Sequence, residues 1–139
     1  MAAIHATDTK PELKIRKALF ARGYRYRLYS EKLPGKPDLV LPKYRTAIFI
    51  HGCFWHGHEN CYLYKKPRSH SAFWSEKIEQ NRIRDRKVTA ELLERGWRVL
   101  VIWKCSIKGR YRLSFDELIS EVESFLHSER SYEEIRSRE

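Results

Sequence analysis

The chain has 139 residues, which is the size of one ordinary domain and too few for two independent enzyme domains. Lysine and arginine number 28 against 18 aspartates and glutamates, so the net charge is +10 and a polyanion is the first partner to consider. Because 42% of the residues are hydrophobic and 13% are aromatic, the composition indicates a folded basic domain rather than a disordered basic tail.

Periodicity and turn residues predict seven elements along the chain. Thr9 and Glu12 have the spacing of a capping box, which predicts a helix start. The strands predicted over 38–41 and 46–50 are joined so closely that they should pair antiparallel. From residue 129 the chain is charged, and we expect it to be frayed. In chain order the predicted elements are a helix over 10–22, strands over 24–29, 38–41 and 46–50, a long helix over 72–95, a strand over 97–103 and a helix from Ser114 to about 128.

This order of elements predicts a compact α/β domain, a mixed sheet flanked by helices, over residues 1–139. An irregular segment over 51–70 interrupts it, and no internal repeat or domain linker is visible. No apolar run approaches the roughly 20 residues of a membrane span, and the first ten residues lack the apolar stretch of a secretion signal. We therefore expect a cytoplasmic protein with no membrane partner.

Cysteines and histidines with metal-ligand spacing lie in the irregular segment. Cys53, His58 and Cys61 are spaced C-x4-H-x2-C, and Cys105 directly follows the last predicted strand. Three thiolates and one imidazole are a common ligand set for structural zinc, and a metal would order a loop that has little core of its own. The alternative is that the cysteines are buried thiols, as free cysteines often are.

One carboxylate and two further histidines favour a catalytic site. Asp38 opens one strand of the predicted antiparallel pair and His51 follows the other, so the two should occupy neighbouring sheet positions. A carboxylate suits Mg²⁺, and the imidazoles of His51 and His56 can handle protons near neutral pH. Taken singly, Asp38 is also an ordinary turn residue, and each histidine is a solvated or core ring or a competitor of His58 for zinc. Their clustering in a basic protein favours catalysis.

Two groups of side chains favour contact with nucleic acid. Phe54 and Trp55 follow a predicted zinc ligand, and either core packing or stacking on bases would explain them. On the long predicted helix, several polar side chains fall on one side, where a solvated face is the ordinary explanation and phosphate contact the functional one. These side chains are Lys77, Asn81, Arg84 and Asp85.

Four segments resemble the very-short-patch mismatch repair endonucleases of bacteria, and the resemblance covers about residues 7–105. The most specific segment is HGCFWH, which stands after Pro-Asp and before a distant cysteine. The four segments are LPGKPD over 33–38, IFIHGCFWH over 48–56, FW with the following Lys, Ile, Asn and Arg-Asp over 73–85, and GWRVL with WKC over 96–105.

The resemblance implies a restriction-endonuclease-like fold of the PD-(D/E)xK superfamily, in which a histidine takes the place of the usual acid and lysine. Such enzymes use Mg²⁺ to nick one strand on the 5′ side of the mispaired T in T:G mismatches. On matching positions, Asp38 would be the metal-binding acid, with the backbone carbonyl of Ile50 as a second ligand. Glu12 would be an accessory acid, and His51 and His56 would handle protons and orient water.

The resemblance also implies roles for the loop. The structural zinc ligands would be Cys53, His58, Cys61 and Cys105, and the aromatics that intercalate beside the mismatch would be Phe54 and Trp55. Three features depart from the family pattern. The basic segment before the first helix is short, the zinc loop is one residue longer than the common version, and Lys104 stands where an acid is common. We expect the last change to be minor because Lys104 neighbours a zinc ligand.

The short N-terminal segment leaves a mismatch nuclease of relaxed specificity as one alternative. A second alternative is a non-catalytic zinc-stabilised DNA-binding module, because the +10 charge and the aromatic side chains would also suit a protein that only binds DNA. The presence of Asp38 together with His51 and His56 favours the enzyme. The expected partner is double-stranded DNA with a mismatch, bound by a monomer associated with the nucleoid. A functional link to a cytosine methyltransferase or to mismatch-repair proteins is also expected.

Overall fold

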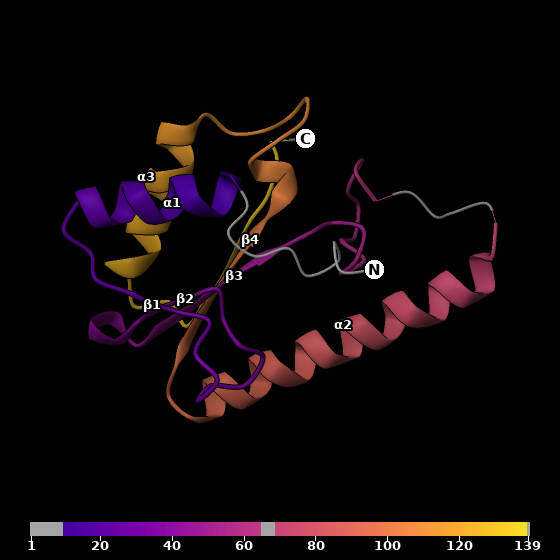
Figure 1. Ribbon diagram of the computed structural model, residues 1–139, viewed down its shortest axis with the longest axis horizontal. Coiled ribbons are helices and arrows are strands. Elements are labelled where there is room, and N and C mark those ends of the chain that lie inside the picture. The colour runs from indigo at the N-terminus through magenta and orange to yellow at the C-terminus, as the bar shows by residue number, and fades with distance from the viewer. Residues whose placement is uncertain (1–9, 65–68, 139) are drawn as a thin grey trace.

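The computed structural model describes residues 10–64 and 69–138. Within these ranges one sheet lies between helices, with α1 and α3 on one side and the long α2 on the other (Figure 1). The elements are α1 (Lys10–Ala21), β1 (Arg27–Leu28), β2 (Leu39–Leu41), the 3-10 turn η2 (Pro42–Tyr44), β3 (Thr46–His51), α2 (Ser71–Glu94), β4 (Arg98–Trp103), the 3-10 turn η3 (Lys104–Ser106), α3 (Phe115–Leu126) and β5 (Tyr132–Ile135).

The strands of the described residues pair in chain order, β1-β2-β3-β4-β5. The antiparallel pairing predicted for residues 38–41 and 46–50 is confirmed, with Leu39 opposite Ile48. β3, β4 and β5 run parallel, which requires long crossovers, and α2 and α3 supply them. The predicted mixed sheet flanked by helices is therefore confirmed as a mixed α/β architecture.

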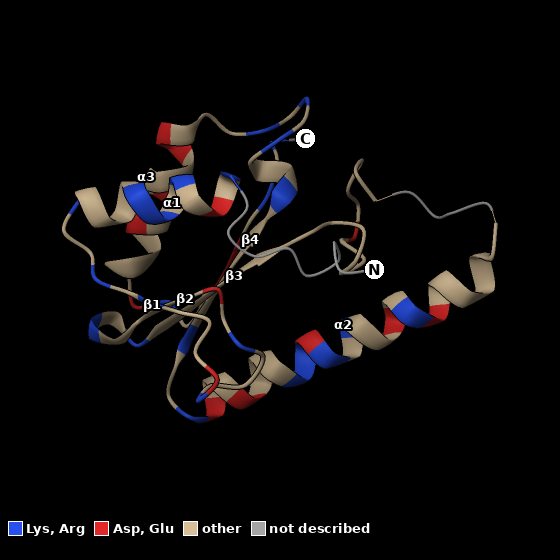
Figure 2. Ribbon diagram, in the orientation of Figure 1, with Lys and Arg blue, Asp and Glu red and all other residues tan. Residues whose placement is uncertain are grey.

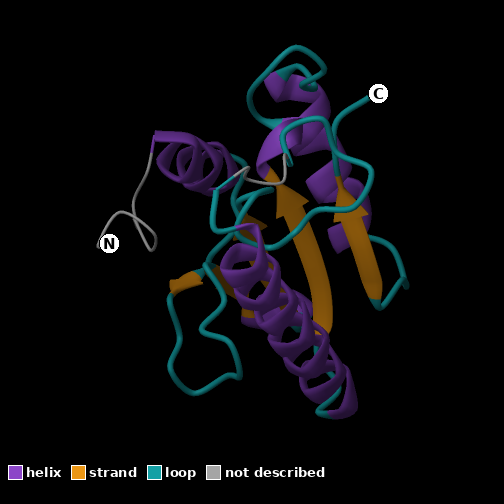
Figure 3. Cartoon of the chain, turned by 90° about the vertical axis from the view of Figure 1, so that its right-hand side faces the viewer, coloured by secondary structure: helices purple, strands orange, loops and turns teal. Residues whose placement is uncertain are grey.

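The two faces of the sheet pack against different helices (Figure 3). On one face, residues such as Ile48 and Leu100 join the buried side chains of α1 and α3. On the other face, Val101 packs with Leu92 of α2 and with the cysteines of the irregular segment. Because both faces are covered, β3 and β4 are apolar along their length instead of alternating, as buried parallel strands usually are.

The helix limits lie within two residues of the predicted ones, and α3 begins with the expected cap. Ser114 Oγ accepts a hydrogen bond from the Glu117 N–H at 3.1 Å, and Glu117 Oε1 accepts one from the Ser114 N–H at 3.2 Å. This reciprocal pair satisfies two backbone donors at the helix start. The other predicted capping residue, Thr9, lies outside the described residues.

The strand predicted over 24–29 is reduced to Arg27–Leu28. Tyr24 is a core residue instead, packed with the buried side chains of α1 and α3. Its hydroxyl donates to Glu123 Oε2 at 2.9 Å and lies 2.8 Å from His127 Nε2. The alternation of aromatic and basic residues therefore does not reflect a strand at Tyr24. Tyr24 is aromatic because it packs in the core and bonds through its hydroxyl.

The prediction of a frayed tail from residue 129 is wrong. Residues Tyr132–Ile135 form β5 and pair with β4, placing Ile135 opposite Ile102. Ile135 is only 3% exposed, whereas its neighbours in β5 are polar and more accessible. Because an edge strand buries few of its own side chains, the composition of β5 resembles that of a solvated tail. Its pairing with β4 makes it a strand.

Charge is distributed unevenly over the helices (Figure 2). α1 is mainly basic, α3 carries acidic residues, and α2 carries both signs along its length. No helix in the described ranges combines the length and apolarity needed to cross a bilayer.

Candidate active site and metal centre

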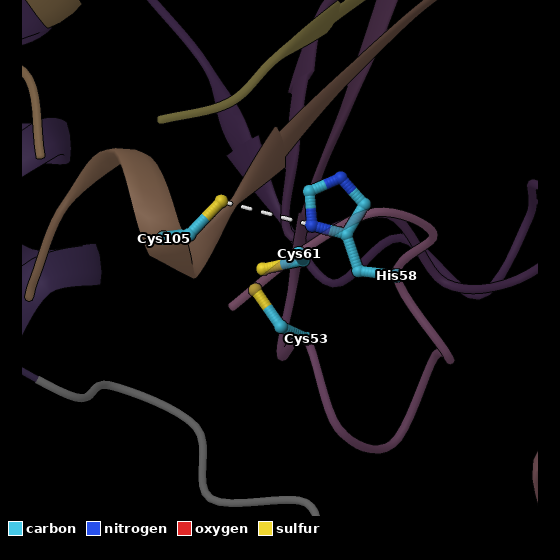
Figure 4. Close-up of side chains that lie close together, drawn as sticks. All are labelled: Cys53, His58, Cys61 and Cys105. Carbon is cyan, nitrogen blue, oxygen red and sulfur yellow. Dashed lines mark hydrogen bonds between the residues drawn. The ribbon is translucent and has the colours of Figure 1, made fainter. Parts of the chain in front are cut away.

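The three cysteines and one histidine predicted to bind zinc lie together in the structure (Figure 4). Cys53, His58 and Cys61 come from the loop after β3, and Cys105 comes from η3 at the end of β4. All four are buried, with at most 6% of each residue exposed. Because β3 and β4 are adjacent parallel strands, their ends meet at one edge of the sheet, and the fourth ligand arrives beside the other three.

The cluster fits a tetrahedral zinc ion. Its four ligand atoms all lie within 4.8 Å of one another, and His58 Nδ1 is 3.7 Å from Cys105 Sγ. Zinc bonds of about 2.3 Å to sulfur and 2.1 Å to nitrogen would separate these two atoms by roughly 3.6 Å. His58 Nε2 is buried and has no hydrogen-bond partner among the described residues. The ring nitrogen that faces the cluster is therefore Nδ1.

The thiols of this cluster differ in pKa. A hydrogen bond from Cys53 lowers the pKa of Cys105 to about 3, and contacts with His58 and the Ser137 N–H act in the same direction. The same hydrogen bond, together with burial, raises the pKa of Cys53. These contacts favour the thiolate form of Cys105, which is the form of cysteine that binds metals.

Asp38 lies at the start of β2 with its carboxylate against β3. Asp38 Oδ2 accepts a hydrogen bond from the Ile50 N–H at 2.6 Å. Burial raises the pKa of Asp38 to about 6; the Ile50 hydrogen bond lowers it, the charge of Glu12 raises it, and His56 and Lys104 lower it. Glu12, buried in α1, is thus part of the same electrostatic cluster. A cation placed there would relieve the cost of a buried carboxylate beside a second acid.

Lys104, expected to be a minor departure, also acts on this carboxylate, as the smallest of the influences named above. Its charge lowers the pKa of Asp38, so it lies near enough to be felt there. The reason is the parallel pairing of β3 and β4, which ends both strands at the same edge. One residue therefore neighbours the cysteine cluster in sequence and the carboxylate in space.

His51 and His56 form a stacked pair at the same edge. Their ring centroids are 3.8 Å apart and the planes differ by 4°. His56 Nδ1 lies 2.7 Å from Asp85 Oδ2, a contact made by a residue of α2. The pKa of His51 is well below its usual value because the ring is buried and lies near His56 and His58. The pair and Asp85 border a pocket of about 790 Å³, also lined by Arg86.

The orientation of this pair does not favour joint metal binding. His51, His56 and Asp85 offer ligand atoms within 4.8 Å of one another, which by distance alone would permit a shared ion. The lone pairs of an imidazole lie in the plane of its ring, however, and two parallel rings direct theirs in parallel rather than toward one point. The bond from Asp85 instead fixes one nitrogen of His56 and leaves the other for chemistry.

The aromatics after Cys53 belong to a partly exposed cluster that extends onto α2. The Phe54 and Trp55 rings lie 5.1 Å apart, and Trp74 lies 5.7 Å from Phe54 and 5.4 Å from Trp55. All three residues are half-buried, while Phe73 beside them is 60% exposed. Neither simple interpretation of Phe54 and Trp55 is complete, because the rings pack on one another and still reach the surface.

The predicted helix residues divide into two kinds. Lys77 and Arg84 are exposed. Asn81 instead holds the loop, because its Nδ2 donates to the Trp55 carbonyl at 2.8 Å.

Arg82 also holds this loop. It donates to the Gly57 carbonyl through Nε at 2.9 Å and Nη2 at 2.6 Å. Gly57 has φ +56° and a Cβ there would lie 2.5 Å from Arg82 Nε, so this close approach requires glycine.

Comparison with known proteins identifies the family. Residues 1–63 match the family model described as DNA mismatch endonuclease Vsr. DNA mismatch endonuclease Vsr of Escherichia coli (strain K12) is 43% identical over 129 residues, covering 93% of this chain and 82% of the relative. The chain belongs to the Vsr family. Type II nicking enzyme V.NmeAIP of Neisseria meningitidis is 45% identical over 124 residues, which is 88% of each protein. V.XorIIP of Xanthomonas oryzae is 46% identical over 107 residues, covering 77% and 78%.

In this member of the Vsr family, sequence reasoning overlooked the contact of Asp85 with the histidine pair. Asp85 belongs to the polar face of α2 that was expected to be solvated or to contact phosphate, yet its carboxylate bonds His56. Trp74 and Trp103 were likewise placed only within family segments, and they pack on the aromatic cluster and the histidines. A carboxylate on the same helix face as Asn81 was the one available signal, because Asn81 and Asp85 are one turn apart.

Proposed function

We propose that this chain is a Mg²⁺-dependent DNA endonuclease that nicks one strand on the 5′ side of the mispaired T in T:G mismatches. Its fold would be restriction-endonuclease-like, as a single domain over residues 1–139. Membership of the Vsr family supports the activity, since relatives carry the names of mismatch endonucleases and nicking enzymes. The net charge of +10 supports a polyanionic substrate.

The observation that carries this proposal is the convergence of the Asp38 carboxylate, buried Glu12 and the stacked histidines at one sheet edge. Asp38 would hold Mg²⁺, with the Ile50 carbonyl as a second ligand and Glu12 as an accessory acid. When bound, Mg²⁺ polarises the scissile phosphate and offsets the charge that develops in the transition state. Burial raises the pKa of Asp38, and a bound cation would offset this cost of burial by favouring the ionised form.

The histidines would divide the proton transfers. The lowered pKa of His51 leaves its ring unprotonated, so it would act as a weak base toward the attacking water. His56 is bonded to the Asp85 carboxylate through Nδ1, an arrangement that fixes the ring and orients the other nitrogen. His56 is therefore suited to hold a proton for the leaving 3′ oxygen.

The remaining predicted residues would bind substrate and stabilise the loop. Cys53, His58, Cys61 and Cys105 would hold a structural Zn²⁺. Phe54 and Trp55 would stack beside the mismatched pair, supported by Trp74. Exposed Lys77 and Arg84 would contact phosphates, while Asn81 would act mainly by holding the loop through the Trp55 carbonyl. We propose a cytoplasmic, nucleoid-associated monomer linked in function to a cytosine methyltransferase or to mismatch-repair proteins.

Strand-specific nicking tests this function. End-labelled duplexes containing each mismatch, and a fully paired control, are incubated with zinc-loaded protein with and without Mg²⁺. We expect a Mg²⁺-dependent nick 5′ to the T of T:G only. Nicks at several mismatches would support the relaxed nuclease instead. Salt-sensitive binding with no nick under any of these conditions would favour the non-catalytic binding module.

A further inference from the structure

β5 reaches the site through one carboxylate. Glu134 Oε1 accepts a hydrogen bond from the Trp103 indole N–H at 2.7 Å, and Glu134 Oε2 accepts one from the Tyr132 hydroxyl at 2.7 Å. Trp103 is the last residue of β4 and pairs with His51 of β3 in the sheet. Because alternate residues of a strand share a face, Tyr132 and Glu134 both lie on the side that lines the 790 Å³ pocket next to the histidines.

Trp103 touches three histidines and is itself 8% exposed. Its ring stacks on that of His58 at 3.9 Å with planes 5° apart. It meets His51 edge-on at 5.4 Å and His56 at 6.3 Å. The indole therefore stands between the cysteine cluster and the stacked pair, and its orientation sets how closely both are packed.

The residues after β5 contact the loop that carries His58 and Cys61. Arg136 donates to the carbonyls of Glu59 at 3.2 Å and Asn60 at 2.8 Å. The Ser137 N–H contacts Cys105 Sγ at 3.3 Å. The segment from Tyr132 to Ser137 therefore contacts the loop between His58 and Cys61, a cysteine of the cluster, and the indole that packs on the histidines.

We propose that Glu134 is a positioning residue for strand nicking and acts through Trp103 on the orientation of His51 and His56. An indole has a single N–H donor, so a fixed acceptor selects one orientation of a ring that could otherwise turn. The inference rests on the proposed function for its kinetic consequence, but the positioning itself is a property of the free protein. Because Glu134 is exposed, water can partly replace its carboxylate, and the effect of its loss is limited.

Three variants test the inference. Glu134→Ala removes the acceptor, whereas Glu134→Gln keeps a carbonyl oxygen that can accept from the indole N–H. Glu133→Ala is the matched control, since Glu133 adjoins Glu134 in β5 but pairs with Arg130. We expect Glu134→Ala to lower kcat about 3- to 10-fold, the range of one hydrogen bond that water partly replaces, with unchanged KM for DNA, melting temperature and zinc content. Glu134→Gln and Glu133→Ala should stay within about twofold of the parent.

A second measurement is independent of nicking. Heteronuclear NMR of the free, zinc-loaded protein follows the indole N–H of Trp103, assigned by Trp103→Phe, and the ring protons of His51 and His56. Glu134→Ala should shift all three, and Glu133→Ala none. Unchanged histidine signals and unchanged kcat in Glu134→Ala would overturn the inference. Absence of nicking by the parent protein would instead refute the proposed function, and the NMR comparison would still decide the positioning.

Discussion

The loop after β3 supplies both the cysteine cluster and the histidine pair, yet the two groups are built in opposite ways. In the cysteine cluster every ligand residue is buried and the donor atoms converge. In the histidine pair the residues are only partly buried, the rings are parallel, and one nitrogen of His56 is occupied by Asp85. Convergence and closure suit a structural ion, whereas parallel rings beside an open pocket suit proton transfer.

Residue type and separation alone therefore do not distinguish these two kinds of side-chain cluster. Both groups bring together histidines and acids or thiols within the same short distance. What separates them is ring orientation and access to solvent. Substitutions in each cluster, and a change of pH, can test this contrast.

Cys61→Ser breaks the closed cluster. A structural zinc ion in a small domain contributes on the order of 10 kcal/mol of binding free energy, so we expect the variant to lose zinc and most of its folded population. Metal content by mass spectrometry and thermal unfolding by circular dichroism measure this. Glu59→Gln, an exposed change in the same loop, is the control and should keep both zinc and melting temperature. An unchanged zinc content in Cys61→Ser would mean that the cluster is not the zinc site.

Asp38→Asn breaks the open site without unfolding the protein. The amide can still accept from the Ile50 N–H, but it carries no charge for Mg²⁺. We expect nicking of a T:G duplex to fall by about 10³-fold or more, with binding to the duplex retained. Single-turnover nicking and gel-shift titration are the measurements. Substantial residual cleavage would remove Asp38 from the metal role.

Asp85→Asn sharpens the assignment of the histidine pair. Its loss of charge weakens support for protonated His56 while leaving the packing of α2 in place, so we expect kcat to fall about 10²-fold. Glu91→Gln, which alters another carboxylate of α2 near its end, should nick normally. If both variants keep full activity, the bond between Asp85 and His56 has no part in the reaction.

The carboxyl of Asp38 should make the stability of the protein depend on pH. Folding raises the pKa of Asp38 from 3.8 to about 6, so the folded state holds the proton more tightly than the unfolded state. Stability contributed by this group is therefore lost as pH rises from about 4 to above 6. Zinc-loaded Asp38→Asn without Mg²⁺ should exceed the parent by at most about 3 kcal/mol near pH 7 and match it near pH 4. Urea unfolding at both pH values checks this, and equal stability near pH 7 would contradict it.

Local sequence signals predicted most elements of the fold because those elements are stabilised locally. The capping residues of α3 and the apolar runs of β3 and β4 are visible without any tertiary contact. β5 and the core role of Tyr24 were missed because their order comes from distant partners, Ile102 for the strand and Glu123 for the tyrosine.

The composition of both clusters is visible in the sequence, since the cysteine and histidine spacing, the Pro-Asp pair and the family segments are properties of the chain. Their geometry depends on tertiary contacts. Parallel pairing of β3 with β4 delivers Cys105 to the loop and Lys104 toward Asp38, and the crossing of α2 delivers Asp85 to His56. These contacts join residues tens of positions apart, and a hydrogen bond at that separation depends on how sheets and helices pack rather than on any local preference.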